Sequence, residues 1–218
     1  MAPRAGRLVT ETLGCDGGRR VTVYVPPESV RAIVFAADGG WHLSDLSERL
    51  EGADAGGTMV VGVDGLPDDG GRLEEYVPGV DEPRFEAHET FFVFDVRRWV
   101  SSRFGVRLPA DRTAVWGASL GGEFALAMGL RHPDVYGTVL VASPGAGFRP
   151  LVPLPSPLPR VYLLAGRQEP FFLENATRWD QALREANADA VMVERDGEHG
   201  GPFWAEEFPL MVAWAFGD

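Results

Sequence analysis

One serine of the sequence lies in a turn that suits a nucleophile. The segment Gly117-Ala118-Ser119-Leu120-Gly121-Gly122 follows a short apolar run and leads into a helical pattern. The spacing G-x-S-x-G between a strand and a helix is typical of a nucleophile elbow, a tight turn that projects the serine oxygen above a sheet. Glycines flank it because side chains there would collide with the neighbouring strand and helix. The alternative is a serine in an ordinary glycine-rich turn, and the flanking strand and helix favour Ser119 as a nucleophile.

A nucleophilic serine needs a general base, and the chain has four histidines. His132 ends the helix that follows Ser119, where a histidine favours the helix dipole and is usually structural. His88 lies in a polar stretch, which is consistent with a solvated side chain, and His42 follows an Asp-Gly-Gly-Trp turn. His199 lies in a glycine-flanked loop after the last predicted strand. Because the histidine comes last in the α/β-hydrolase order of serine, acid and histidine, we predict His199 as the base.

The third group of such a site is a carboxylate between the serine and the histidine. Glu169 follows the apolar run 161–164, at the end of a predicted strand, and Asp196 stands three residues before His199. An acid on the histidine's own loop would have to fold back under the imidazole ring, whereas this fold usually positions its acid at a neighbouring strand end. We therefore predict Glu169 as the acid and keep Asp196 as the alternative. The structural explanation of Glu169 would be a carboxylate at a helix N-terminus.

Acyl transfer also needs hydrogen-bond donors for the oxyanion that develops on the substrate. The backbone N–H of Leu120, directly after the serine, is the first predicted donor. The second should come from the loop after an early central strand, where Ala37-Asp38-Gly39-Gly40-Trp41 stands. Gly39 is the predicted donor and Gly40 the alternative, and the bland interpretation of the segment is a turn before a helix.

The apolar runs indicate the elements that must position these residues. Two early segments, 8–13 and 21–25, predict an antiparallel hairpin. Later apolar runs do not alternate, which is typical of parallel strands covered by helices on both faces. These runs are 32–36, 59–63, 113–116, 138–141 and 161–164, and the helical patterns are 41–51, 90–104, 120–130, 171–188 and 202–216. The order predicts an α/β fold with a mostly parallel central sheet, an antiparallel N-terminal hairpin and helices on both faces. With the elbow at Ser119, we expect a single α/β-hydrolase domain over 1–218.

Two segments, 65–86 and 143–159, interrupt this alternation. The first is rich in Gly, Asp and Pro, and the second carries many prolines. Both follow the carboxyl ends of strands, where ligands bind in such sheets. Irregular connections of this length are uncommon unless they are functional or mobile, so we predict functional loops here; the alternative is a plain surface connection.

The composition limits the partners and the chemistry. The chain has 218 residues and a formal net charge of −12 at pH 7, which argues against binding nucleic acid or an anionic membrane. Its one cysteine, Cys15, excludes an internal disulfide and a zinc finger. No apolar run is long enough for a membrane span, and we see no signal peptide, so we expect a cytoplasmic location. Nothing in the sequence implies a cofactor or a metal.

Several segments together resemble the putative-esterase family, which includes the enterochelin esterases, esterase D and the antigen 85 mycolyltransferases. The resemblance covers most of the chain from about Val30 onward. The segments are 35–41, 72–78 with the pattern R-x-x-E-Y-x-P, 111–144, 164–170 and 198–204. The resemblance implies that they contain the oxyanion loop, the segment after the next strand, the nucleophile, the acid and the histidine, in that order.

The residues and the resemblance both predict a serine hydrolase of a small-molecule carboxylic ester. Ser119 would attack the carbonyl while His199 takes its proton, and water would then cleave the acyl-enzyme. The alternative is an acyltransferase in which an alcohol or amine replaces water, and a non-catalytic binding module is a second alternative of a different class.

Two further residues are predicted to contact the substrate. Trp41 is one of several aromatic residues near the active edge, and these favour an aromatic or apolar acyl group. Arg72 is one of few cations near an acidic edge, and a guanidinium suits a carboxylate or catecholate. The alternative for Arg72 is a surface ion pair with Glu74 or Glu75.

Overall fold

The computed structural model describes residues 6–39, 49–50, 52–53, 55–151 and 153–217. The strands are β1 (Arg7–Leu13), β2 (Arg19–Val25), β3 (Ala32–Ala37), β4 (Thr58–Val63), β5 (Thr113–Ala118), β6 (Thr138–Ala142), β7 (Arg160–Gly166) and β8 (Ala190–Arg195). The helices are α2 (Asp69–Tyr76), α3 (Glu82–Thr90), the π-helical turn η1 (Phe91–Asp95), α4 (Val96–Phe104), the 3-10 turn η2 (Ala110–Arg112), α5 (Leu120–Arg131), α6 (Pro170–Glu185) and α7 (Gly201–Phe216).

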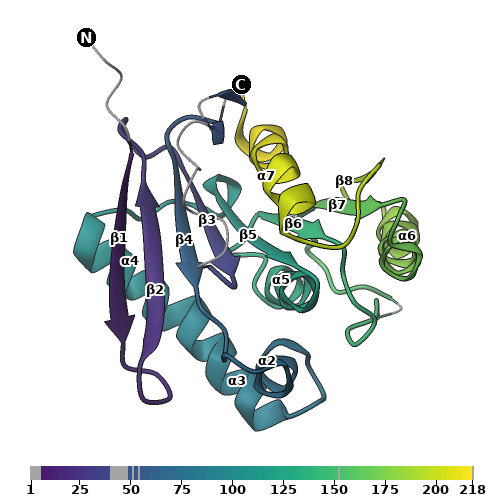
Figure 1. Ribbon diagram of the computed structural model, residues 1–218, viewed down its shortest axis with the longest axis horizontal. Helices are drawn as coiled ribbons and strands as arrows, with labels where there is room; N and C mark the ends of the chain where they lie inside the picture. The colour runs from purple at the N-terminus through teal and green to yellow at the C-terminus, as the bar shows by residue number, and fades with distance from the viewer. Residues whose placement is uncertain (1–5, 40–48, 51, 54, 152, 218) are drawn as a thin grey trace.

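The strands form an eight-stranded sheet in the order β1-β2-β4-β3-β5-β6-β7-β8 (Figure 1). β1 pairs with β2, and β2 with β4, in antiparallel fashion. From β4 to β8 all neighbouring strands are parallel. Parallel neighbours need long crossover connections, and helices supply those between β5 and β6 (α5) and between β7 and β8 (α6). The predicted mostly parallel sheet with an antiparallel N-terminal hairpin is therefore confirmed.

Helices cover both faces of the sheet, which is why the central strands read as unbroken apolar runs. On one face, Phe208, Met211 and Val212 of α7 join a buried cluster with Val34 and Trp116 from the sheet. On the opposite face the buried cluster draws on α2 to α6. Figure 1 shows α7 on one side of the sheet and α4 and α5 on the other. Since β3 and β5 are buried along their whole length, the carboxyl ends of the parallel strands are where polar side chains can reach solvent.

The structure corrects two sequence-based boundaries. The segment 65–86 is not an irregular loop: it contains α2 and the start of α3, whose first turns are capped by the Asp68 and Asp81 carboxylates. The helix predicted over 90–104 begins earlier, because α3 continues through η1 into α4. Phe91, Phe92 and Val93 are consecutive and all buried, a pattern that one α-helical stripe does not provide, and a π-helical turn interrupts the helix there.

The other predicted elements agree closely with their ranges where the structure describes them. The edge strand β8 was not predicted, because it is half-buried to exposed and its short apolar run is followed by two charged residues. Of the helix predicted over 41–51, only Arg49 and Leu50 are described, both in helical conformation. Among the described residues of 143–159 there is no helix or strand. In the part of the chain that the structure describes, no helix has both the length and the apolar character of a membrane span.

Candidate active site

Ser119 stands in a strained turn between β5 and α5. Its backbone angles are φ 55° and ψ −123°, a conformation that a residue with a side chain rarely adopts and that costs of order 1–3 kcal/mol. The Ser119 N–H donates to the Ala142 carbonyl (3.0 Å), which holds the turn against the end of β6. A Cβ on Gly117 would clash with the Gly121 carbonyl, so the turn accepts no side chain at that position. The predicted elbow geometry is present at Ser119.

His199 reaches Ser119 from the loop between β8 and α7. Its Nε2 lies 3.1 Å from Ser119 Oγ, and its Nδ1 lies 2.7 Å from Glu169 Oε2. The ring is held between two aromatic side chains: Phe172 stacks on it at 3.7 Å between ring centroids, and Trp204 meets it edge-on at 4.7 Å. Both imidazole nitrogens are thus engaged, one by a carboxylate and the other by a hydroxyl.

Glu169 is buried at the N-terminus of α6, just beyond the end of β7. Its Oε2 faces His199, and its Oε1 accepts two hydrogen bonds, from the Gly166 N–H (2.7 Å) and from the Ser143 hydroxyl (2.5 Å). The alternative acid, Asp196, lies elsewhere: its side chain is 78% exposed and forms an ion pair with Arg167 (2.9 Å). The structure therefore places Glu169, and not Asp196, beside the imidazole.

Two of the other histidines have roles away from Ser119, and His42 lies outside the described residues. His132 Nε2 contacts Glu89 Oε1 (2.8 Å) at the end of α5. His88 is buried, which corrects the interpretation of a solvated side chain. It lies among aromatic rings beneath α2, where burial and then the neighbouring Arg19 guanidinium lower its pKa from 6.5 to about 3.

Of the two predicted oxyanion donors, the structure contradicts Gly39 and not Leu120. Leu120 is the first residue of α5, so its N–H has no acceptor four residues back within that helix. The Gly39 N–H, by contrast, donates to the Val63 carbonyl (3.1 Å). Gly39 is therefore not a free donor, because the backbone there extends the pairing of β3 with β4. Gly40 and Trp41 lie outside the described residues.

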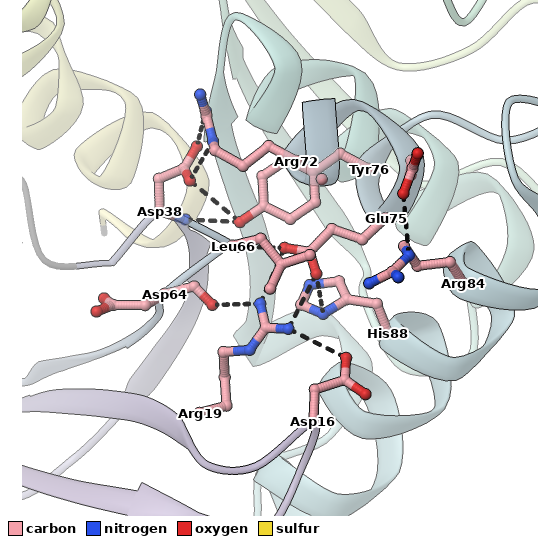
Figure 2. Close-up of polar contacts among 12 residues, drawn as sticks. Asp16, Arg19, Asp38, Asp64, Leu66, Arg72, Glu75, Tyr76, Arg84 and His88 are labelled. Carbon is pink, nitrogen blue, oxygen red and sulfur yellow. Dashed lines mark hydrogen bonds and ion pairs between the residues drawn. The ribbon is translucent and has the colours of Figure 1, made fainter. Parts of the chain in front are cut away.

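Arg72 has a different partner from those that the sequence suggested. Figure 2 shows Arg72 in contact with Asp38. Arg72 Nη2 and Nε lie 2.6 and 3.1 Å from the Asp38 carboxylate oxygens, and Nη1 lies 3.3 Å from Asp69 Oδ1. The Tyr76 hydroxyl also donates to Asp38 (3.2 Å). Asp38 needs this support because it has a positive φ of 55° in the turn after β3. The guanidinium is thus engaged by protein carboxylates, which disfavours the hypothesis that it faces the substrate.

Glu75 completes the pattern R-x-x-E-Y that begins at Arg72. Its two oxygens accept from Nη1 and Nη2 of buried Arg19 at 2.9 and 3.0 Å, and one of them also accepts from the Leu66 N–H (Figure 2). Burial raises the pKa of Glu75, and the Arg19 guanidinium opposes that rise. Through these contacts, α2 is connected to three other segments. Arg72 bonds Asp38 at the end of β3, and Glu75 bonds Arg19 at the start of β2 and Leu66 after β4.

Glu123 and Ser143 were not predicted as site residues, but both are buried and hydrogen-bonded near the carboxyl ends of the strands. Glu123, in the first turn of α5, is 1% exposed, and its carboxylate accepts from the backbone N–H groups of Gly147 and Phe148. Burial raises its pKa to about 7 against those hydrogen bonds. Ser143 contacts Glu169 from the end of β6. An isolated acid in the apolar helix 120–130 was the available signal for Glu123, and Ser143 had no signal beyond its position after a strand.

The chemistry available at this edge is that of a hydroxyl, an imidazole and a carboxylate in contact. No group of three or more His, Cys, Asp or Glu side chains that could hold a metal ion occurs within the described ranges.

The profile of the family described as "Putative esterase" matches residues 11–190. The chain belongs to this family. A search of curated proteins finds no match.

The chain is similar to several solved structures. Against the enterochelin esterase of Shigella flexneri the TM-score is 0.81, with 20% identity over 98% of this chain and 60% of that chain. Against a ferulic acid esterase the TM-score is 0.74, with 19% identity over 97% of this chain and 99% of the other. Against the S-formylglutathione hydrolase of Staphylococcus aureus the TM-score is 0.70, with 12% identity over 97% of this chain and 98% of the other.

These similarities establish the fold. The chain spans 60% of the length of the enterochelin esterase that it matches. The neighbours share the α/β-hydrolase fold with this chain.

Proposed function

We propose that this esterase is a serine hydrolase that cleaves a small-molecule carboxylic ester through an acyl-enzyme on Ser119. The observation that carries the proposal is the line of contacts from Glu169 Oε2 to His199 Nδ1 (2.7 Å) and from His199 Nε2 to Ser119 Oγ (3.1 Å). A carboxylate, an imidazole and a hydroxyl in this order recur in serine hydrolases on unrelated folds, because geometry and role define the arrangement.

In the acylation step, Ser119 Oγ attacks the ester carbonyl carbon and His199 Nε2 takes the hydroxyl proton. Glu169 accepts from the Nδ1–H, so it fixes the tautomer that leaves Nε2 free as a base, and it stabilises the imidazolium that forms. The imidazolium then gives its proton to the departing alkoxide, and the alcohol leaves. Water repeats the sequence on the acyl-enzyme, with His199 again as the base.

The Leu120 N–H, at the start of α5, is the first proposed donor to the oxyanion of the tetrahedral intermediate. It has the geometry of the residue that directly follows a nucleophile at a helix N-terminus. With the Gly39 N–H donating to Val63, Gly40 becomes the proposed second donor. The mechanism requires no cofactor.

The test of the nucleophile is covalent labelling with a fluorophosphonate, which traps an activated serine. Mass spectrometry of the labelled peptide should place the adduct on Ser119, and Ser119→Ala should abolish both labelling and ester hydrolysis. An adduct on Ser143 or Ser156, or failure of the wild-type protein to label, would overturn the proposal. Failure to label would instead favour a binding module that keeps the fold.

The substrate class is best sought with an ester panel. Phe171, 55% exposed, packs edge-on against Phe172, which itself stacks on His199. This apolar surface next to the imidazole supports an aromatic or apolar acyl group. The structural neighbours suggest adding a feruloyl ester and S-formylglutathione to p-nitrophenyl esters of short and long acids. A product shift from acid to new ester when an alcohol is added would identify the acyltransferase instead.

A further inference from the structure

Ser143 occupies an unusual position at the end of β6. It is fully buried, and its φ of 49° lies in the left-handed region. A residue with a side chain is disfavoured there, and glycine would adopt the same backbone without strain. The hydroxyl of Ser143 lies between two other buried side chains, Glu169 and Trp204. A strained, buried serine at this place therefore contributes something that glycine could not.

The direction of the two hydrogen bonds at Ser143 follows from the chemistry of tryptophan. An indole N–H can only donate, so the Ser143 oxygen accepts from Trp204 Nε1 (2.9 Å). The single hydroxyl proton of Ser143 is then directed at Glu169 Oε1 (2.5 Å). Trp204 thus selects the rotamer in which Ser143 donates to the carboxylate.

The two donors on Glu169 Oε1 determine how the carboxylate is turned. The Gly166 N–H (2.7 Å) and the Ser143 hydroxyl both donate to Oε1, which leaves Oε2 for His199 Nδ1. The Gly166 N–H and the Ser143 hydroxyl are neutral donors, so among the described contacts of Glu169 no arginine or lysine balances its negative charge. A carboxylate held in this way presents its free oxygen and its charge to the imidazole.

Trp204 also connects this arrangement to the histidine. It lies five residues after His199 in the chain, and its ring meets the imidazole edge-on at 88°. The Trp204 N–H of the backbone donates to the Gly200 carbonyl (3.3 Å), so the first turn of α7 continues the histidine loop. One side chain therefore contacts the base directly and the acid through Ser143.

We propose that Ser143 and Trp204 are positioning residues that hold the Glu169 carboxylate in the orientation required by His199. The proposal rests on the proposed function, in which Glu169 is the acid. The hydroxyl of Ser143 orients Oε1, and the indole N–H of Trp204 orients that hydroxyl. Neither side chain touches the reacting atoms.

The decisive variant is Ser143→Gly, which removes the hydroxyl while relieving the left-handed backbone. A buried hydrogen bond to a charged group is lost, so kcat should fall by about 10- to 100-fold. KM should stay within about twofold, since the substrate is not contacted. The acid limb of the kcat/KM profile should move to lower pH, because a loosened carboxylate stabilises the imidazolium less. A residue with a merely structural role would not shift that profile.

A matched control is Asn187→Gly. Asn187 also has a left-handed φ of 55°, but it is exposed beyond the end of α6 and far in the chain from Ser119. This variant relieves the same kind of backbone strain and should leave kcat and the pH profile unchanged. Equal effects of the two glycine variants on kcat would overturn the proposal.

A second variant, Trp204→Phe, keeps an aromatic edge toward His199 and removes the N–H. It should lower kcat by about 3- to 10-fold, less than Ser143→Gly, because Ser143 can still donate once its rotamer is released. If Ser143→Gly does not fold, as judged by circular dichroism, this variant decides the question. A kcat within twofold of the wild-type value for every folded variant would overturn the proposal.

Fluorophosphonate labelling separates this proposal from the proposed function. The wild-type protein should label at Ser119, and Ser143→Gly should label more slowly by the same factor as its loss in kcat. Normal labelling of the wild type together with an unchanged rate in Ser143→Gly overturns the positioning role alone. A wild-type protein that does not label overturns the serine mechanism itself.

Discussion

Asp38 and Glu169 are buried or half-buried carboxylates at the same edge of the sheet, on opposite sides of β5, and they are held in opposite ways. Asp38 receives both Nε and Nη2 of the Arg72 guanidinium, with the Tyr76 hydroxyl as a further donor. Glu169 receives a hydroxyl, a backbone N–H and an imidazole. An arginine balances the charge of Asp38, whereas the described contacts of Glu169 include no arginine.

A second pair of buried carboxylates, Glu75 and Glu123, shows the same contrast between an arginine partner and neutral donors. On the Asp38 side, buried Glu75 is paired with Arg19 through two hydrogen bonds. On the Glu169 side, buried Glu123 has only backbone N–H partners among its described contacts, and burial raises its pKa to about 7. The arginine-paired Asp38 carboxylate holds a turn, whereas the Glu169 carboxylate presents an oxygen to the imidazole that becomes cationic in the proposed mechanism. We therefore expect the two sides to respond differently to substitution and to pH.

The largest expected effect comes from removing the unbalanced charge. Glu169→Gln should lower kcat by up to about 10⁴ with little change in KM, because the amide no longer stabilises the imidazolium or enforces its tautomer. Steady-state kinetics on the best ester of the panel would measure it. Asp196→Asn is the control: the exposed Asp196 pairs with Arg167, and its loss should change kcat by less than twofold. The reverse ranking of the two variants would move the acid to Asp196.

The next largest effect concerns acid stability on the Asp38 side. His88 has a pKa of about 3 in the folded protein, below the ordinary 6.5, because of burial and then Arg19. Between pH 6.5 and 3, His88 therefore binds a proton in the unfolded chain but stays neutral in the folded protein. Stability present above pH 6.5 should fall as pH drops toward 3, by up to about 4–5 kcal/mol from this one group.

His88→Phe should flatten this acid dependence. The ring lies among Tyr76, Phe92 and Phe124, and neither of its nitrogens has a hydrogen-bond partner in the described structure. Its Nδ1 lies 3.8 Å from Glu75 Oε2, so phenylalanine loses that contact but no hydrogen bond. Urea unfolding at a series of pH values from 4 to 8 measures the slope. If the variant and the wild type lose stability in parallel, His88 does not set the acid limit.

On the Glu169 side, Glu123 should make the protein less stable as pH rises, the opposite of the pH dependence expected from His88. Because the pKa of Glu123 is raised to about 7 from 4.5, the folded protein holds a proton there that the unfolded chain has already lost. Its contribution to stability should therefore fall as pH rises from 4.5 through 7, by about 3 kcal/mol. Glu123→Gln stays neutral and should gain stability over the wild type at pH 8 but not at pH 4.5. A gain of equal size at both pH values would contradict this account.

The smallest expected effect is that of Arg72→Gln. The variant weakens the hold on Asp38 and should lower kcat about 10-fold, through the turn that precedes the proposed oxyanion donor. The loss should be the same for anionic and neutral esters. A rise in KM confined to anionic esters would instead restore Arg72 as a substrate contact. A double-mutant cycle with Asp38→Asn should show a coupling of about 1–3 kcal/mol, since the two side chains contact each other.

Local sequence was enough to predict the elbow and every strand of the sheet except the edge strand β8. Unbroken apolar runs indicate strands buried on both faces, and the turn at Ser119 is contained within a few consecutive residues between a strand and a helix. Chain order separated His199 from His132 and His88, because the fold dictates which strand ends follow the nucleophile. The preference for Glu169 over Asp196 came from the same rule, and the contact with His199 agrees with it.

Only the tertiary structure decided how the polar groups pair. Arg72 meets Asp38, which lies 34 residues earlier in the chain, and no spacing in the sequence distinguishes that partner from nearby Glu74 or Glu75. Nor does the sequence show that the Gly39 N–H donates to the Val63 carbonyl on the neighbouring strand. Ser143, Glu169 and Trp204 likewise come from three separate segments. Periodicity reports which residues are buried, but a hydrogen bond between distant segments depends on where the folded backbone brings them, and that is a property of the whole packed sheet.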